Sequence, residues 1–232
     1  MSAAPFVAAV LASEVRLIME IKRRSAAGDD LTAGRSAAEL VRLYQDAGAP
    51  CLSVVTGRWF GGDAALLDDV LRATDRPVLQ KDFFTRRAQL DRAAAAGVCA
   101  VLLTAQLLRR ESLEILVEHA LGVGLTPFVE VISAEEIASV PRAGECAIAV
   151  NNKDIRDQER GSARLDRSLE LVHEVLATGT PLAVSASGID SRDDVDRLLG
   201  AGYGGLLVGS SLLAGSLASS LVTQQTSDGA HR

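Results

Sequence analysis

The chain has 232 residues, a hydrophobic content of 48% and a formal net charge of −6 at pH 7. This length suits one α/β barrel domain, which commonly takes roughly 200–250 residues, and the apolar content is ample for its core. An acidic chain without a long basic run is not expected to take nucleic acid or an anionic membrane as its main partner.

The three cysteines, Cys51, Cys99 and Cys146, are scattered and lack CxxC spacing. We therefore expect reduced thiols in a cytoplasmic protein, and neither a disulfide nor a metal site. The N-terminal residues are small and apolar but have no basic start, so no signal peptide is expected. No apolar run reaches the ~18 residues of a membrane span. We expect a single barrel domain over residues 1–222, followed by a disordered polar tail over 223–232.

Short apolar runs alternate with amphipathic segments along the chain. In chain order, the patterns predict a strand near 15–21, a helix over 37–47, a strand over 51–55, a helix over 64–72, a strand from 77 running into 80–82, a helix over 86–96, a strand over 99–103, a helix over 107–121, a strand over 127–131, a helix over 134–140, a strand over 147–150, a helix over 164–177, a strand over 181–184, a helix over 192–199, a strand over 205–208 and a helix over 211–221.

Eight such units in one domain predict a (β/α)8 barrel. The strands are continuous apolar runs, as expected when both faces of a parallel sheet are buried. The alternative is an open, doubly wound sheet. It is disfavoured because no GxGxxG motif follows the first strand and because polar residues stand at nearly every strand end.

The polar residues at these strand ends are the candidate site. Glu20 and Lys22 lie two apart on the first strand and so share one face. The ends of later strands carry Lys81, Glu130, Asn151, Ser185 and Ser187, and then Gly209 and Ser210. Taken singly, such a residue is more often a solvated strand end or part of a structural ion pair. Together, at the carboxyl ends of barrel strands, they predict two lysines, two carboxylates and an amide around one mouth, which suits acid–base chemistry.

The last two units also carry small residues at their helix starts. Ser187-Gly188-Ile189 follows the seventh strand, and Gly209-Ser210-Ser211 follows the eighth. Serine and glycine often do no more than cap helices. Their presence in two adjacent loops favours a phosphate-bearing ligand, because free backbone N–H groups and the helix dipole bind anions there.

Several stretches fall in an order that resembles one known family. They are MEIKRRS (19–25), VVTGRWFGG (54–62), PVLQKDFF (77–84), AVLLTA (100–105), FVEV (128–131), AVNNKDI (149–155), SGI (187–189) and LLVGSSLL (206–213). Over about residues 5–215 the chain resembles indole-3-glycerol phosphate synthase, a barrel enzyme of tryptophan biosynthesis. The resemblance implies a carboxy-lyase that closes an indole ring on 1-(2-carboxyphenylamino)-1-deoxyribulose 5-phosphate, losing CO2 and water without cofactor or metal.

The resemblance also implies roles for individual residues. Lys81 would be the general acid, Glu130 the acid/base partner in the dehydration, and Glu20 the group that orients a lysine. Lys22 would pair with the aryl carboxylate, and Asn151 and Ser187 would contact the substrate. The phosphate-binding positions would be Ser25, Lys153, Gly188, Gly209 and Ser210, and the aryl pocket would be lined by Phe60, Phe83 and Leu102.

The chain departs from the family pattern in four places. Ala186 stands where the family has an active-site Glu, and Lys153 where it commonly has Arg. The first loop reads Ser25-Ala26-Ala27 instead of Ser-Pro-Ser, and the N-terminal helical extension is largely absent. Two alternatives therefore stay open: a divergent paralogue acting on another phosphorylated aminoketose, and a catalytically silent barrel that binds a phosphorylated ligand. The retained charged residues favour an enzyme, and we expect a monomer or homodimer.

Overall fold

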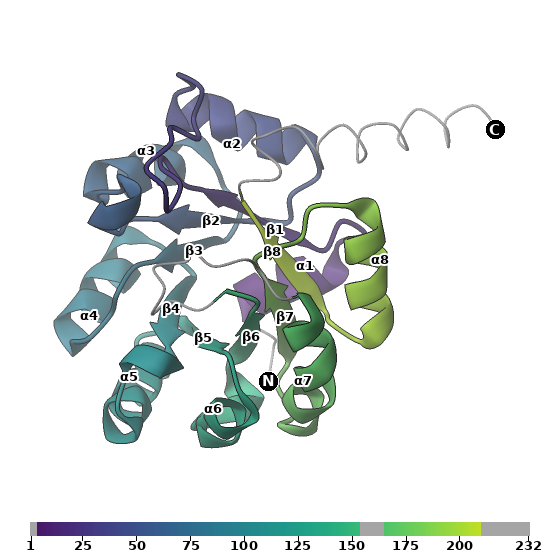
Figure 1. Ribbon diagram of the computed structural model, residues 1–232. Helices are drawn as coiled ribbons and strands as arrows, with labels where there is room; N and C mark the ends of the chain where they lie inside the picture. Colours follow the sequence, from purple (N-terminus) through teal and green to yellow (C-terminus); the bar gives the residue numbers. More distant parts are fainter. Residues whose placement is uncertain (1–3, 154–164, 210–232) are drawn as a thin grey trace.

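Eight parallel strands close into a barrel surrounded by helices (Figure 1). The computed structural model describes residues 4–153 and 165–209. The strands are β1 (Leu17–Ile21), β2 (Cys51–Val55), β3 (Val78–Lys81), β4 (Ala100–Thr104), β5 (Thr126–Val131), β6 (Ala147–Asn151), β7 (Leu182–Ala186) and β8 (Gly205–Val208). Because β1 pairs with both β2 and β8, the sheet has no free edge. The predicted (β/α)8 barrel is confirmed.

The described helices cover the outside of the barrel, except for the first, α1, which lies at its amino end. They are α1 (Pro5–Ala12), α2 (Ala37–Asp46), α3 (Ala64–Ala73), α4 (Arg87–Ala96), α5 (Arg110–Gly122), α6 (Ala134–Ser139), α7 (Leu165–Ala177) and α8 (Arg192–Ala201). Three short 3-10 helices lie in segments between strands and helices: η1 (Arg58–Phe60), η2 (Ala105–Leu107) and η3 (Ala143–Glu145). None of these helices is long and apolar enough to span a membrane. The predicted helix over 211–221 and the tail over 223–232 lie outside the described residues.

Each strand contributes to two layers of core, because successive side chains point to opposite faces. On β1, Leu17, Met19 and Ile21 pack among residues of the surrounding helices, whereas Ile18 packs inside the barrel. Glu20 follows Ile18 on the inward face, near the carboxyl end of the strand. Because of the same alternation, the inward-facing residues at the carboxyl ends of the strands surround one opening of the barrel, here called its mouth.

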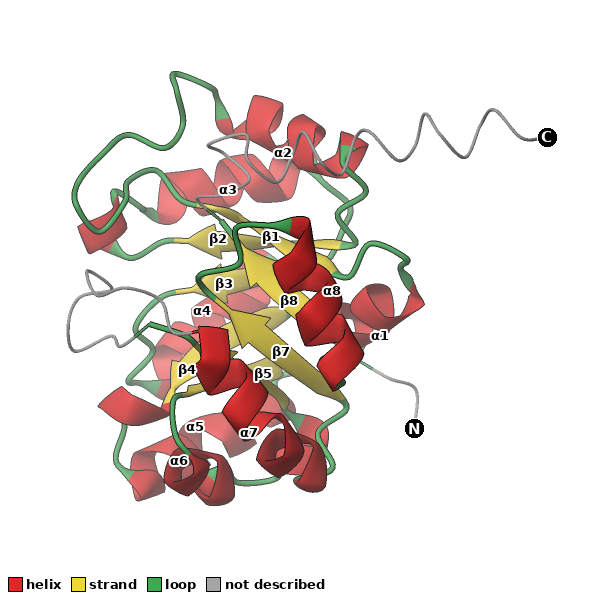
Figure 2. Ribbon diagram, turned by 45° about the vertical axis from the view of Figure 1, so that its right-hand side comes forward, coloured by secondary structure: helices red, strands yellow, loops and turns green. Residues whose placement is uncertain are grey.

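The helix α1, which the sequence analysis did not predict, closes the amino end of the barrel. The fully buried Phe6 packs edge-on against Phe128, with ring centroids 6.1 Å apart. Val7 and Val10 join the same interior cluster. Figure 2 shows α1 at the end of the barrel from which the strands start. The helix was missed because its neighbouring residues are also apolar, so no amphipathic period marks it.

Candidate active site

Four charged side chains meet inside the carboxyl end of the barrel. Nζ of Lys81, at the end of β3, lies 3.1 Å from Oε2 of Glu20 on β1 and 3.9 Å from Oε2 of Glu130 on β5. Lys22, directly after β1, places its Nζ 3.7 Å from Oε1 of Glu20. None of these side chains is more than 12% exposed. Of the two ammonium groups, two carboxylates and one amide expected at the mouth, the four charged groups thus meet in one cluster.

Glu20 stays ionised in this buried setting. Burial alone would raise the pKa of its carboxyl, but the charges of Lys81 and Lys22 outweigh that effect and leave the pKa below its usual value. The strand beneath it is held in place by Tyr44 of α2, whose buried hydroxyl donates a hydrogen bond to the Glu20 carbonyl. Glu20 is therefore a fixed anion against which two lysine side chains are placed.

An aromatic cavity opens on one side of this cluster. We use this name for the space lined by Phe60, Phe83 and Leu102, which also reaches Glu20, Lys22, Lys81 and Glu130. The ammonium of Lys22 lies 4.9 Å from the centre of the Phe60 ring, within cation–π range. The cavity thus combines flat apolar walls with an ammonium at its edge, a combination that suits an aryl group carrying a carboxylate.

A glycine-rich cavity opens on the other side. It is lined by Lys153, Ser187, Gly188 and Gly209, and it shares Glu20, Lys22 and Lys81 with the aromatic cavity. A Cβ at position 209 would lie 3.1 Å from Oε1 of Glu20, so a glycine lets the end of β8 approach this carboxylate. Backbone amides and a lysine at a barrel mouth are the usual means of binding a phosphate.

Asn152, buried behind the glycine-rich cavity, anchors its loop. The Asn152 side chain donates hydrogen bonds to the Ser187 carbonyl at 3.0 Å and to Ser185 Oγ at 3.2 Å. Its Oδ1 accepts from the amide and the hydroxyl of Ser168 on α7. Ser187 has a φ of +70°, and so has Gly188. Two successive left-handed residues are costly when the first is not glycine, and the bonds of Asn152 hold that turn in place.

In the side-chain amide of Asn151, at the end of β6, only the oxygen takes part in a hydrogen bond among the described residues. Oδ1 accepts a hydrogen bond from the amide of Lys153, whereas the buried Nδ2 has no hydrogen-bond partner among the described residues. Asn151 stands beside Ala186 in the register of β6 and β7. A buried amide donor without an acceptor costs free energy, so an acceptor group introduced beside it would be stabilised.

The shape and charge of the two cavities suit acid–base chemistry on an elongated ligand with an aromatic end and an anionic end. A model of the indole-3-glycerol phosphate synthase family matches residues 2–223. This chain belongs to the indole-3-glycerol phosphate synthase family. The family resemblance stated from the motifs is thereby confirmed.

Curated relatives agree with this assignment, and a solved structure shares the fold. The chain is 36% identical over 228 residues to the indole-3-glycerol phosphate synthase of Mycolicibacterium vanbaalenii, covering 97% of this chain and 81% of that one. It is 36% identical over 200 residues to the synthase of Syntrophobacter fumaroxidans, covering 86% and 74%. A tryptophan synthase A-subunit from Pyrococcus furiosus has a TM-score of 0.64 at 13% identity, covering 91% of this chain and 96% of that chain, which shows the shared fold.

Most of the residues expected from the synthase family line the two cavities. The aromatic cavity holds Phe60, Phe83 and Leu102, and the glycine-rich cavity holds Lys153, Ser187, Gly188 and Gly209. Ser25 and Asn151 are not among the residues that line either cavity. The Ser25 hydroxyl donates to Asp29 within its own loop, 2.8 Å away. Its phosphate role stays a prediction, and Ser210 lies outside the described residues.

Ala186 ends β7 inside the barrel, where the synthase family has its glutamate. The side chain is 1% exposed and belongs to the interior cluster with Val184 and Leu207. The methyl group therefore removes one carboxylate from the top layer of the barrel and leaves an apolar surface in its place. The cluster around Lys81 keeps its own two carboxylates.

Two residues of the site were missed from the sequence. Asp82 follows Lys81 and lines the aromatic cavity, and Asn152 follows Asn151 and holds the Ser187 turn. Each is a polar residue just beyond a strand, a signal that could have singled them out. Asp82 accepts a hydrogen bond from Thr56, and Asn152 contacts Ser168 and Ser187. These partners lie elsewhere in the chain, and spacing alone does not reveal such pairs.

Proposed function

We propose that this chain closes an indole ring on 1-(2-carboxyphenylamino)-1-deoxyribulose 5-phosphate. The observation that carries the proposal is the position of Lys81 Nζ, between Glu20 and Glu130, where the aromatic and glycine-rich cavities meet. A substrate with a carboxylated ring at one end and a phosphate at the other would present its ketose carbonyl near this ammonium.

In the first step, the ring carbon that bears the carboxylate attacks the ketose carbonyl carbon and forms the new carbon–carbon bond. Lys81 gives a proton to the carbonyl oxygen, which becomes a hydroxyl. Lys22 holds the aryl carboxylate until CO2 leaves, and the electrons of the broken bond restore the aromatic ring. Glu20 keeps the Lys81 ammonium charged and oriented.

In the second step, the new hydroxyl leaves as water. It must gain one proton, and the neighbouring carbon must lose one, so that the indole double bond forms. Glu130 is the proposed acid/base partner in this dehydration, because its carboxylate lies beside Lys81. Asn151 and Ser187 would hydrogen-bond the substrate. The phosphate would be held by Ser25, Lys153, Gly188, Gly209 and Ser210.

The direct test is to incubate the protein with this substrate and to follow indole fluorescence. We expect product from the wild-type chain and almost none from Lys81→Ala. Tight binding without turnover would identify a silent barrel and overturn the proposal. If the protein neither bound nor turned over this compound, its substrate would be a different one.

Ala186 favours one second candidate, a paralogue that acts on another phosphorylated aminoketose. Replacing a carboxylate by a methyl group changes both the charge and the space at the mouth, so a different substituent could be accommodated there. Turnover of such a ketose with a higher kcat/KM than the carboxyphenyl compound would establish it.

We infer that the protein works in the cytoplasm as a monomer or homodimer, on a small phosphorylated substrate. The three free cysteines support a reducing compartment. Sedimentation of the purified protein would distinguish the two oligomeric states.

A further inference from the structure

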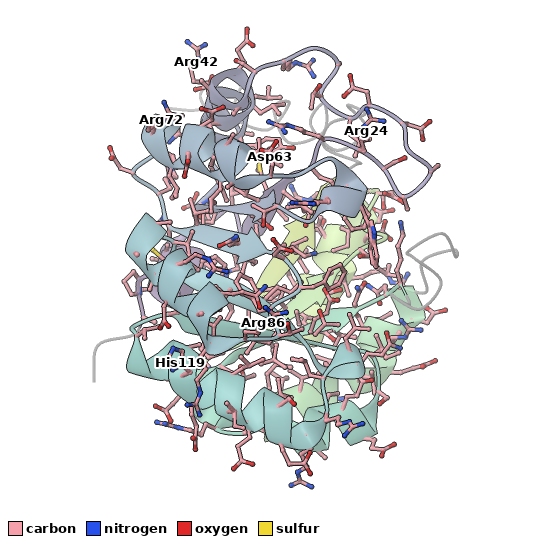
Figure 3. All side chains as sticks on the ribbon, turned by 90° about the vertical axis from the view of Figure 1, so that its left-hand side faces the viewer. Arg24, Arg42, Asp63, Arg72, Arg86 and His119 are labelled. Carbon is pink, nitrogen blue, oxygen red and sulfur yellow. The ribbon has the colours of Figure 1, made fainter. Side chains whose placement is uncertain are left out.

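The two phenylalanines of the aromatic cavity come from two neighbouring loops. Phe60 belongs to η1 in the loop after β2, and Phe83 lies in the loop after β3, the next strand of the barrel. In Figure 3, the labelled Asp63 and Arg86 mark where these loops reach α3 and α4. The shape of the aromatic cavity therefore depends on how the two loops are held relative to each other.

Asp82 joins the two loops through both oxygens of its carboxylate. Oδ2 accepts a hydrogen bond from the hydroxyl of Thr56, the first residue after β2, at 2.7 Å. Oδ1 accepts from the backbone amide of Phe83 at 2.8 Å. Asp82 itself lines the aromatic cavity. One side chain thus connects the loop after β2 to the backbone of a residue that forms the aryl wall.

Thr56 gives this connection a fixed anchor. It is only 5% exposed, and its amide donates to the Lys81 carbonyl at 2.9 Å. Its hydroxyl accepts from Gln80 Nε2 at 3.1 Å while it donates to Asp82, so the two bonds reinforce each other. The chain folds back closely on this residue at Gly62, where a Cβ would lie 2.7 Å from the Thr56 Cα. The anchor is therefore held by both its backbone and its side chain.

The position of Phe83 follows from the same bonds. A hydrogen bond from its amide to the preceding side chain restricts rotation of the chain between Asp82 and Phe83, which sets the direction of the Phe83 side chain. The Phe83 carbonyl accepts from Gln89 Nε2 of α4 at 3.2 Å. The Phe83 ring also lies at 63° to that of Trp59, with centroids 5.4 Å apart. Because Trp59 is the neighbour of Phe60 in η1, this ring contact joins the same two loops.

We propose that Asp82 is a positioning residue that makes the aromatic cavity selective for a flat ring. It acts through Thr56 and Phe83, by holding the loop that carries Phe60 against the loop that carries Phe83. This inference rests on the proposed function, which assigns the aromatic cavity to the aryl end of the substrate. Walls that are held in place favour a thin, rigid ring over a thicker ring of equal charge, whereas walls that move would accept both.

The test uses benzoate as the probe, with cyclohexanecarboxylate as an analogue that has the same charge and a thicker, puckered ring. Ligand-observed NMR titrations of the full chain measure both dissociation constants without any turnover. We expect the wild type to prefer benzoate. Asp82→Ala should weaken benzoate binding by roughly five- to tenfold, as expected for lost hydrogen bonds, and change the affinity for cyclohexanecarboxylate by less than about twofold.

Two further variants separate positioning from charge and from general stability. Asp82→Asn keeps an acceptor for the Phe83 amide, so benzoate should bind within about threefold of the wild-type affinity. Thr56→Val removes only the hydroxyl, and it should weaken benzoate binding by roughly threefold or more even if Asp82→Ala does not fold.

Asp30→Ala is the matched control. Like Asp82, Asp30 accepts hydrogen bonds from a backbone amide and from a threonine hydroxyl, in this case both of Thr32. It lines neither the aromatic nor the glycine-rich cavity. Its replacement should leave the affinities for both probes unchanged.

Four results would overturn the positioning role of Asp82. They are a wild type without saturable binding of benzoate or without preference for it, equal weakening of the two probes in Asp82→Ala, equal losses in Asp82→Asn and Asp82→Ala, and unchanged benzoate binding in Thr56→Val. A wild type that selects benzoate through Asp82 but does not close the indole ring would contradict the proposed reaction and not this role.

Discussion

Lys81 and Glu20 form the central ion pair of the barrel mouth, with Nζ and Oε2 3.1 Å apart. They come from β3 and β1, and β2 lies between these strands in the barrel wall. The contact is therefore made across the barrel interior, by the long, flexible side chain of a lysine reaching a carboxylate on an inward-facing position. It fixes the proton donor of the proposed reaction.

Removing that proton donor should abolish most of the activity. Lys81→Ala is expected to lower kcat by roughly 10²–10⁴-fold, the usual contribution of a positioned acid, while the affinity for the substrate changes much less. The measurement is indole fluorescence under single-turnover conditions. Arg87→Ala, at an exposed site, is the control for general effects. A variant at position 81 that retained kcat within a few-fold would exclude Lys81 as the acid.

The lowered pKa of Glu20 predicts a specific dependence of stability on pH. Because the folded-state pKa lies below the usual value of 4.5, Glu20 stabilises the fold above that pH. This stabilisation is lost as the pH falls through the lower, folded-state pKa. Glu20→Gln should unfold more easily near neutral pH by about 3 kcal/mol, since the ammonium groups of Lys22 and Lys81 each lose one buried carboxylate partner.

The check is the free energy of unfolding in urea at a series of pH values. The difference between wild type and Glu20→Gln should shrink as the solution becomes acidic. If the difference stayed constant down to the pH at which the wild type unfolds, the carboxylate would not be responsible.

Asn152 is expected to act on phosphate binding through the Ser187 turn. Asn152→Ala removes the bond to the Ser187 carbonyl, so KM for the phosphorylated substrate should rise by roughly tenfold with a smaller fall in kcat. Tyr203→Phe is the matched control. It removes a 2.7 Å hydrogen bond to the Ser168 carbonyl in the same buried network but does not touch Ser187.

Both variants should lower the melting temperature, and only Asn152→Ala should raise KM. An equal effect of the two on KM would show that the network acts through general stability alone.

Restoring a carboxylate at position 186 should increase turnover. Ala186→Glu places the new side chain beside Asn151, whose buried Nδ2 has no acceptor among the described residues and can donate to it. A lost transition-state contact of this kind is worth about 2–4 kcal/mol, which corresponds to roughly 30-fold to 10³-fold in kcat. Ala186→Gln, similar in size but uncharged, is the control, and kcat for the carboxyphenyl substrate is the measurement. A fall in kcat in the folded Glu variant would show that the pocket serves another substrate.

Phe6 should contribute to stability from the opposite end of the barrel. Phe6→Ala leaves a hole against Phe128 and is expected to lower the free energy of unfolding by about 3–5 kcal/mol. Leu11→Ala on the same helix is 42% exposed and should cost far less. Denaturant titration measures both. Similar losses of unfolding free energy in the two variants would mean that α1 does not pack against the barrel interior.

The barrel architecture could be predicted because it depends on local patterns. β2 and α2 are examples: an unbroken apolar run at 51–55 and an amphipathic segment beginning at the capping box of Ser36 and Glu39. In a closed parallel barrel all strand ends face one mouth, so placing Lys81 and Glu130 at strand ends already placed them together. The boundaries differed by a few residues, as at α5, because helix ends depend on caps and packing.

Chain order and residue pattern alone thus determined the barrel, its family and the membership of the charged cluster. The tertiary structure decided which side chains touch: the pairing of Lys81 with Glu20, the support of Ser187 by Asn152, the burial of Ala186 and the closure of the barrel by α1. These contacts join residues distant in the chain, and their distances depend on register and packing, which no local pattern records.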